Sequence, residues 1–216
     1  MNTLAQSVII LLLLNNFALL SRGNIRTLIR LMVAQGILLA FLLLVIPVVQ
    51  SFIHTLFSCL AVFCIKGLFL PWLLTRTMRR VVKDPQIAPY ISYNLSLLGG
   101  ILALIFSLWL ETHLPVAHGF FPFLLFPVAF STIFAGFVLI VGRIKAITQV
   151  IGYLAVENGI FLLGLPLLSA TGGFWFEMLI LLDVLVAVFV MGIAINHISS
   201  TFASIDVGRF CALKDR

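Results

Sequence analysis

The sequence predicts an all-α membrane protein that crosses the bilayer seven times. Of its 216 residues, 62% are hydrophobic and only 9% are charged, whereas a soluble domain has about 25% charged residues. The hydrophobic residues form runs of the length that a membrane-spanning helix needs, about 20 residues. The basic residues lie between these runs, on one predicted side of the membrane. These three observations define the fold class and the topology.

Seven apolar runs have the required length, and they cover residues 4–20, 27–48, 52–75, 92–110, 120–141, 147–168 and 175–197. Asn15 and Asn16 interrupt the first run, and we expect both to face other helices. The beginning of the chain lacks the basic segment and the cleavage site of a signal peptide. We therefore expect the first run to be kept as a span.

The positions of the cations predict the orientation of the chain. Twelve of the 13 Lys and Arg residues lie where the first, third, fifth and seventh runs end, and the opposite connections contain none. Cytoplasmic connections of membrane proteins are enriched in Lys and Arg. We therefore expect the N-terminus outside and the C-terminus in the cytoplasm. The net charge of +6 is interpreted as a topology signal, not as a nucleic-acid-binding surface.

The predicted topology divides the chain into four parts. These are an N-terminal half of three helices, a cytoplasmic loop, a C-terminal half of four helices and a cytoplasmic tail, at residues 1–80, 81–91, 92–204 and 205–216. Segments 20–44 and 139–165 each contain a helix end, a basic turn and a helix with a polar residue near its middle. This similarity suggests a repeat that relates the two halves, and the alternative is a chance resemblance between basic turns. Gln35 then corresponds to Glu157 or Asn158 and is a supporting candidate.

Three ionisable residues lie deep inside apolar runs, away from the ends of the runs: Lys66, Glu157 and Asp183. A charge at the centre of a membrane helix costs about 2.5–3.5 kcal/mol on insertion scales, and such residues often mark ion or proton pathways. Burial raises the pKa of a carboxyl group and a nearby cation lowers it, so a moving partner can move a proton. We therefore predict a proton path through these three residues, with Tyr153 and Asn158 supporting Glu157. A permanent structural ion pair is the alternative.

Features of the backbone accompany these charges. Pro71 cannot donate a hydrogen bond to the carbonyl of Gly67, so we expect a bend or a local opening beside Lys66; the alternative is an ordinary kink that serves packing. Pro166 predicts a second kink, in the helix that carries Glu157. Small residues form one face of that helix and predict close packing with another helix, at Thr148, Gly152, Ala155 and Gly159.

The sequence contains no motif for a metal or a cofactor. A P-loop, GxGxxG, CxxC and HExxH are all absent, and the three cysteines, Cys59, Cys64 and Cys211, show no metal-ligand spacing. We therefore expect no metal site, no cofactor and no redox centre of its own in this chain.

The C-terminal segments GRIKAITQVIGYLAVENGIFLLG and LLDVLVAVFVMGIAINHISSTFASIDVGRFCALKD resemble two families of small membrane subunits. These are the K-type subunit of NADH–quinone oxidoreductase and the C-type subunit of multisubunit Na⁺/H⁺ antiporters, and the similarity starts near residue 120. In those families the second helix carries a buried Glu, which Glu157 matches. The third helix carries an acid that Asp183 roughly matches, although Glu is common there. The seven-span form with a buried Lys resembles hydrogenase-4 component E.

The resemblance implies a non-redox subunit in the membrane arm of formate hydrogenlyase or a related energy-converting [NiFe] hydrogenase, in the inner membrane of a prokaryotic cell. It implies antiporter-like and quinone-oxidoreductase-like membrane partners, and a peripheral hydrogenase arm that holds the iron–sulfur clusters and the NiFe centre. The chain would help couple electron transfer to the movement of protons, or of Na⁺. The alternatives are a subunit of a multisubunit Na⁺/H⁺ antiporter and a purely structural membrane scaffold.

Overall fold

The computed structural model describes residues 2–46, 52–81, 90–113 and 122–168, and the regular structure of these ranges is helical. Six stretches in them are long and apolar enough to span a membrane. The helices are α1 (Asn2–Ser21), α2 (Ile25–Val45), α3 (Phe52–Val62), the π-helix η1 (Phe63–Phe69), α4 (Leu70–Val81), α5 (Tyr93–His113), α6 (Leu125–Gly142) and α7 (Ala146–Leu168). The all-α class is confirmed for these ranges, and the predicted seventh span, 175–197, lies outside them.

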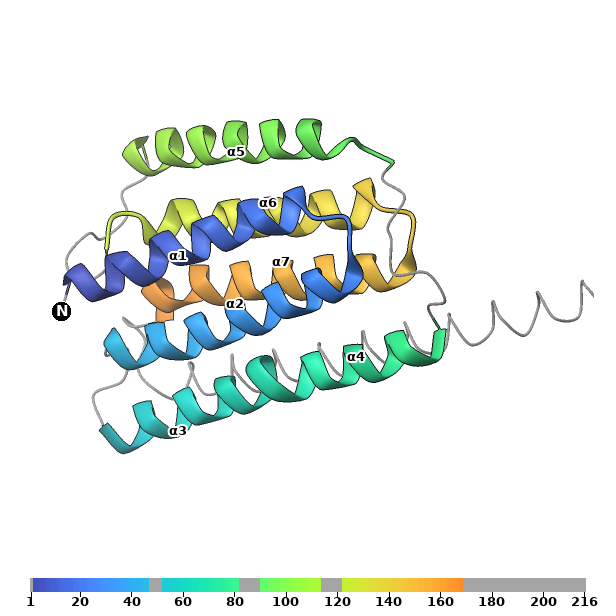
Figure 1. The fold of residues 1–216 in the computed structure, drawn as a ribbon. Helices are drawn as coiled ribbons and strands as arrows, with labels where there is room; N and C mark the ends of the chain where they lie inside the picture. Colours follow the sequence, from blue (N-terminus) through green and yellow to red (C-terminus); the bar gives the residue numbers. More distant parts are fainter. Residues whose placement is uncertain (1, 47–51, 82–89, 114–121, 169–216) are drawn as a thin grey trace, which may run out of the picture.

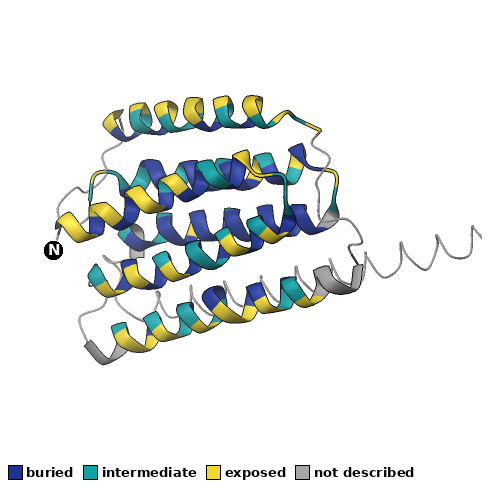
Figure 2. Cartoon of the chain, viewed as in Figure 1, coloured by how far each residue is buried: buried dark blue, intermediate teal, exposed yellow. Residues whose placement is uncertain are grey.

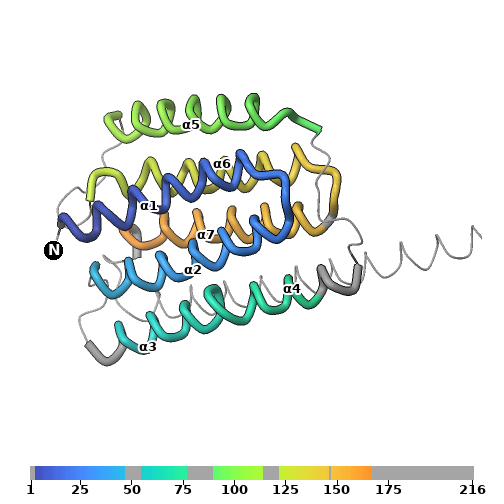
Figure 3. Tube along the Cα trace, viewed as in Figure 1, coloured from blue at the N-terminus to red at the C-terminus, as the bar shows by residue number. Residues whose placement is uncertain are grey.

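The helices lie side by side with their long axes roughly aligned (Figure 1). α6 packs against α7, α5 and α1, while α2 packs against α1, α7, α3 and η1. α5 lies at one edge of the bundle, and the helix formed by α3, η1 and α4 lies at the other (Figure 3). Helices from the two predicted halves of the chain therefore contact each other directly.

Burial separates inner helices from outer ones (Figure 2). In α7, 67% of the candidate span is buried inside the protein, but in α5 only 22% is buried. The exposed side of α5 carries large apolar side chains such as Leu102, Ile105 and Trp109. Such a surface is compatible with lipid, because lipid tails solvate apolar side chains and the helix satisfies its own backbone hydrogen bonds. The helix that carries Glu157 is therefore the most enclosed of the candidate spans.

The predicted close packing of the 147–168 helix is confirmed by its contact with α6. A methyl group added to Gly152 would lie 2.7 Å from the carbonyl oxygen of Gly136. Thr148 and Ala155, on the same face of α7, are completely buried. Residues without bulky side chains let two membrane helices approach closely. This contact fixes α7 against α6 along much of its length.

The third predicted span is one continuous helix whose middle is the π-helix η1. Val62 and Leu70, at the two ends of η1, both have right-handed helical dihedral angles. The amide of Leu70 donates to the carbonyl of Ile65, five residues back, and Pro71 has no amide hydrogen to donate. Lys66 lies in this segment, where the structure has π-helical geometry. π-helical segments are frequent at functional sites.

Local signals explain where α2 begins and ends. Asn24 has an extended backbone, and its side-chain oxygen accepts a hydrogen bond from the amide of Arg26. This is the preferred arrangement at a helix N-terminus. At the other end Ile46 is extended, as expected of a residue that precedes a proline, here Pro47. Both ends of α2 were therefore encoded locally.

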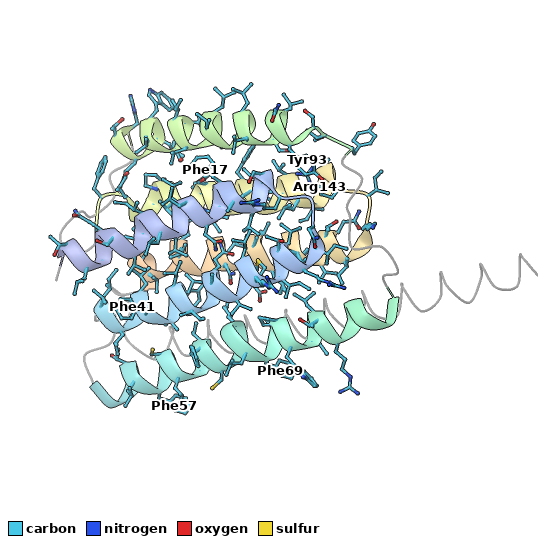
Figure 4. All side chains as sticks on the ribbon, viewed as in Figure 1. Phe17, Phe41, Phe57, Phe69, Tyr93 and Arg143 are labelled. Atoms are coloured by element: carbon cyan, nitrogen blue, oxygen red, sulfur yellow. The ribbon has the colours of Figure 1, made fainter. Side chains whose placement is uncertain are left out.

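One buried arginine joins three connections at the end of the bundle where α1 and α6 end. Arg143 is only 1% exposed. Its guanidinium donates to the carbonyl of Leu20 at 3.0 Å and to that of Ile91 at 2.9 Å, and it lies over the ring of Tyr93 at 4.3 Å from the ring centre (Figure 4). Burial lowers the pKa of this group below its ordinary value, but arginine remains protonated in proteins. The cation that we interpreted as a loop charge is therefore also a structural tie.

Candidate functional site

A chain of hydrogen-bonded polar side chains crosses the interior of the bundle. Its members come from five different helices, and each is between 0 and 6% exposed. They are Asn16 of α1, Gln35 of α2, Lys66 of η1, Thr132 of α6 and Asn158 of α7. Three of these residues, Gln35, Lys66 and Asn158, are candidates that the sequence predicts.

The chain begins at the buried cation. The Nζ of Lys66 donates to the Oδ1 of Asn158 at 2.9 Å. The Nδ2 of Asn158 then donates to the Oε1 of Gln35 at 3.2 Å. Lys66 also lies 5.1 Å from the ring centre of Phe161, within the range in which a cation is attracted to an aromatic face. Gln35 and Asn158, which occupy comparable positions in the predicted repeat, are thus direct partners.

Two further bonds carry the chain to α6. The Nε2 of Gln35 donates to the Oδ1 of Asn16 at 3.0 Å. The Nδ2 of Asn16 donates to the hydroxyl oxygen of Thr132 at 2.8 Å, and this hydroxyl donates to the backbone carbonyl of Val128 at 2.7 Å. A buried polar group that lacks a partner costs about 1–3 kcal/mol. The continuous chain avoids this cost for three amides and one hydroxyl.

Glu157 is the residue next to Asn158 on α7, and it is 8% exposed. The ammonium group of Lys66 is therefore hydrogen-bonded to the immediate neighbour of the buried acid. Charges in a medium of low polarity interact much more strongly than in water.

The other sequence candidates lie in different surroundings. Tyr153 is 45% exposed on α7, and within the described part of the chain its hydroxyl makes no hydrogen bond. Gly67 lies in η1, Pro71 in the first turn of α4 and Pro166 inside α7. Asp183 lies outside the described residues, so its prediction stays untested.

Sequence reasoning missed two members of the chain, Asn16 and Thr132, as site residues. Asn16 was expected to face another helix, which the structure confirms, but its partners were not identified. Asn15 also faces another helix, since its Nδ2 donates to the carbonyl of Leu31 at 3.0 Å. Thr132 gives no signal in the sequence, because a threonine in a helix can satisfy its hydroxyl on the carbonyl four residues back. Only the packing of α1 on α6 reveals its second role.

A metal site is not formed in the described ranges, which contain no group of three or more His, Cys, Asp or Glu residues that could hold an ion. The polar chain itself consists of amides, a hydroxyl and an ammonium. Groups of this kind can hold a charge and orient dipoles, but they do not carry electrons.

Comparisons with known proteins identify relatives that match 94% and 70% of this chain. The chain is 27% identical over 218 residues to the uncharacterized protein Rv0085 of Mycobacterium tuberculosis, an alignment that covers 94% of this chain and 93% of that protein. It is 30% identical over 154 residues to hydrogenase-4 component E of Escherichia coli K12 and to the protein of the same name in Shigella flexneri, with 70% of each chain covered. No protein-family model matches the chain, and no solved structure matches it.

Proposed function

Because this chain belongs to the hydrogenase-4 component E family, we propose that it is a non-redox membrane-arm subunit of an energy-converting hydrogenase or formate hydrogenlyase-type complex. The six apolar helices and the family support a membrane subunit of such a multisubunit complex. Its partners are antiporter-like and quinone-oxidoreductase-like membrane subunits and a peripheral arm with iron–sulfur clusters and a NiFe centre. The complex lies in the inner membrane of a prokaryotic cell, which this chain crosses several times.

In this proposal the chain couples electron transfer in the partner subunits to the movement of protons, or of Na⁺. Glu157 and Asp183 are the protonatable groups, and Lys66 is the charge that sets their affinity for a proton. The observation that carries the proposal is the 2.9 Å bond from Lys66 to Asn158, beside the buried Glu157. A nearby cation lowers the pKa of a carboxyl group, so a change in the distance between the two can make the acid bind or release its proton.

The coupling step needs movement and proton transfer in this chain, but no electron transfer. Electron transfer in a partner would change the charge or the shape of the adjoining membrane subunit. A small displacement of α7 against η1 would then alter the distance between Glu157 and the Lys66 ammonium. The π-helical geometry of η1 supports such a displacement, because π-helical segments depart from the regular hydrogen-bond ladder.

The proposal is tested by Glu157→Gln in the assembled complex, because glutamine keeps the shape of the side chain and cannot titrate. Proton translocation into inverted membrane vesicles is measured per hydrogen molecule evolved, with and without Na⁺. We expect the ratio of translocated ions to hydrogen to fall, because glutamine cannot take up or release a proton. Hydrogen evolution itself should continue.

The matched control is Glu111→Gln. Glu111 is also buried, at 2% exposed, but it lies in the last turn of α5, outside the polar chain. This control should keep the wild-type ratio. An unchanged ratio in Glu157→Gln, with normal assembly of the complex, would reject the coupling role and leave the scaffold interpretation. Equal loss in both variants would show that any buried carboxyl group matters and would also contradict the proposal.

A further inference from the structure

We propose that Asn16, Gln35 and Thr132 are positioning residues, which hold the side-chain carbonyl of Asn158 against the ammonium group of Lys66. The role of Lys66 in this inference rests on the proposed function, whereas the order of the hydrogen bonds comes from the structure alone. The inference comes from the order of donors and acceptors in the buried chain, which is fixed at both of its ends.

The first end is the lysine. An ammonium group has three hydrogen-bond donors and no acceptor. A residue that bonds to it must therefore present an oxygen, and Asn158 presents its Oδ1 at 2.9 Å. If the Asn158 amide were rotated by half a turn, its NH₂ group would face the ammonium, and both groups would be donors. Lys66 thus determines the orientation of Asn158.

The second end is the threonine. The hydroxyl of Thr132 donates its single proton to the carbonyl of Val128 at 2.7 Å. Toward Asn16 this hydroxyl can only accept, and it does so from the Nδ2 of Asn16 at 2.8 Å. The reversed chain would require Thr132 to donate to Asn16 and Lys66 to accept from Asn158. An ammonium group cannot accept a hydrogen bond.

Between these ends only one arrangement of the three amides makes every bond. The oxygen and nitrogen of a side-chain amide are normally assigned from the hydrogen-bond network. Here a rotation of Gln35 alone would place NH₂ against NH₂ on one side and oxygen against oxygen on the other. The same holds for Asn16. The order from Lys66 to Thr132 is therefore set by the chemistry of its two ends.

As a consequence, all three amides turn their oxygen toward Lys66 and their NH₂ group toward Thr132. Aligned hydrogen bonds polarise one another in surroundings of low polarity, so the chain presents a negative end to the ammonium group. Amide side chains have no proton to release near neutral pH. The chain can therefore hold the positive charge of Lys66 against Asn158 without conducting a proton away from it.

The test is the exchange of the Lys66 ammonium protons with water, measured by NMR at neutral pH. The full chain is labelled with ¹⁵N at the lysine Nζ and held in lipid nanodiscs. It contains four lysines, Lys66, Lys83, Lys145 and Lys214, and the Lys66 signal is assigned by its loss in Lys66→Arg. Thr132→Val keeps the shape of the side chain but removes the acceptor for Asn16. We expect Lys66 exchange to become about tenfold faster, the effect of losing about one net hydrogen bond.

Two controls separate positioning from packing. Thr132→Ser retains the hydroxyl and should restore slow exchange. Ser107→Ala removes a buried hydroxyl of α5 that lies outside the chain and bonds to the carbonyl of Ala103, and it should leave the rate unchanged. If Thr132→Val does not fold, Asn16→Leu breaks the same link from the other side and should give the same acceleration.

The inference would be overturned if Lys66 exchange were unchanged in Thr132→Val, or in Asn16→Leu where it replaces Thr132→Val. It would also be overturned if exchange were as fast in Thr132→Ser as in Thr132→Val. The measurement reads Lys66 directly and requires no ion movement. Faster exchange in Thr132→Val together with intact pumping in Glu157→Gln would therefore reject the proposed function but retain the positioning role. Lost pumping in Glu157→Gln together with unchanged exchange in Thr132→Val would reject the positioning role but retain the proposed function.

Discussion

Gly36 of α2 lies directly against the peptide group that follows Lys66. A methyl group added to Gly36 would be 2.6 Å from the carbonyl oxygen of Lys66 and 2.9 Å from the amide nitrogen of Gly67. In η1 the amide of Leu70 donates its hydrogen bond to the carbonyl of Ile65, whereas in an α-helix it would donate to the carbonyl of Lys66. The backbone of α2 thus approaches the π-helix at the residue that carries the buried charge. The absence of a side chain at residue 36 allows this approach.

Gly36→Ala is expected to destabilise the protein by about 1–3 kcal/mol, because the added methyl group meets backbone atoms that cannot rotate away. It should also weaken the bond from Lys66 to Asn158, since η1 must move. Thermal unfolding in detergent measures the first effect. Gly99→Ala is the matched control, because a methyl group there would lie 3.5 Å from the ring of Phe134, an ordinary contact. Equal unfolding temperatures in both variants would contradict the prediction.

Arg143→Lys is expected to lower the free energy of unfolding by about 1–3 kcal/mol, because one ammonium cannot reproduce the planar fork that bonds Leu20 and Ile91. The change keeps the positive charge, so the orientation of the chain should not change. Unfolding in detergent measures the stability, and a cysteine-accessibility assay measures the orientation. The control is Arg30→Lys, an exposed position on α2. A loss of stability as large in the control would argue against the structural tie.

Asn24→Ala removes the side chain that accepts from the amide of Arg26. The expected loss of stability is about 0.5–2 kcal/mol, the usual cost of losing a helix cap of this type. Asn24→Ser supplies another oxygen and should recover most of the loss. Helix unfolding followed by circular dichroism provides the measurement. If Ala and Ser were equally destabilising, the cap would not explain the role of Asn24.

A double-mutant cycle on Lys66→Met and Asn158→Leu tests how strongly the two side chains are coupled. Each single change leaves a buried polar partner behind, whereas the double change removes both. We expect the double variant to be less destabilised than the sum of the two single variants by about 1–3 kcal/mol. Unfolding in detergent measures all four proteins. An additive result would show that the 2.9 Å bond contributes no coupling.

The helices of the described ranges were predictable because long apolar runs in lipid have few alternatives to helices. The run at 27–48 became α2, and that at 92–110 became α5, with boundaries that differ by up to three residues. The tight face of α7 was also predictable, because its small residues recur at helical spacing. Its partner helix, α6, was not, since helix packing depends on contacts far apart in sequence.

The candidate site was predictable only in part. Lys66, Glu157 and Asn158 stand out as polar residues in apolar surroundings. Threonine is common in membrane helices, so Thr132 does not stand out in the sequence. The burial of Arg143 was equally hidden, because a basic residue between two spans normally marks the cytoplasmic side. Its partners are a carbonyl 123 residues earlier and another 52 residues earlier. Backbone carbonyls are present at every residue, so a sequence cannot identify which ones are bound.

The contact between Arg143 and Leu20 imposes a parity rule on the path of the chain. Two touching residues must lie at the same face of a bilayer, so the helices between them must cross it an even number of times. In the proposed topology, α2, the continuous helix from α3 to α4, α5 and α6 each cross once, which satisfies this rule with four crossings (Figure 1). Reporter tags at the start of α1 and at the turn before α7 should therefore always mark opposite compartments, whichever way the protein inserts.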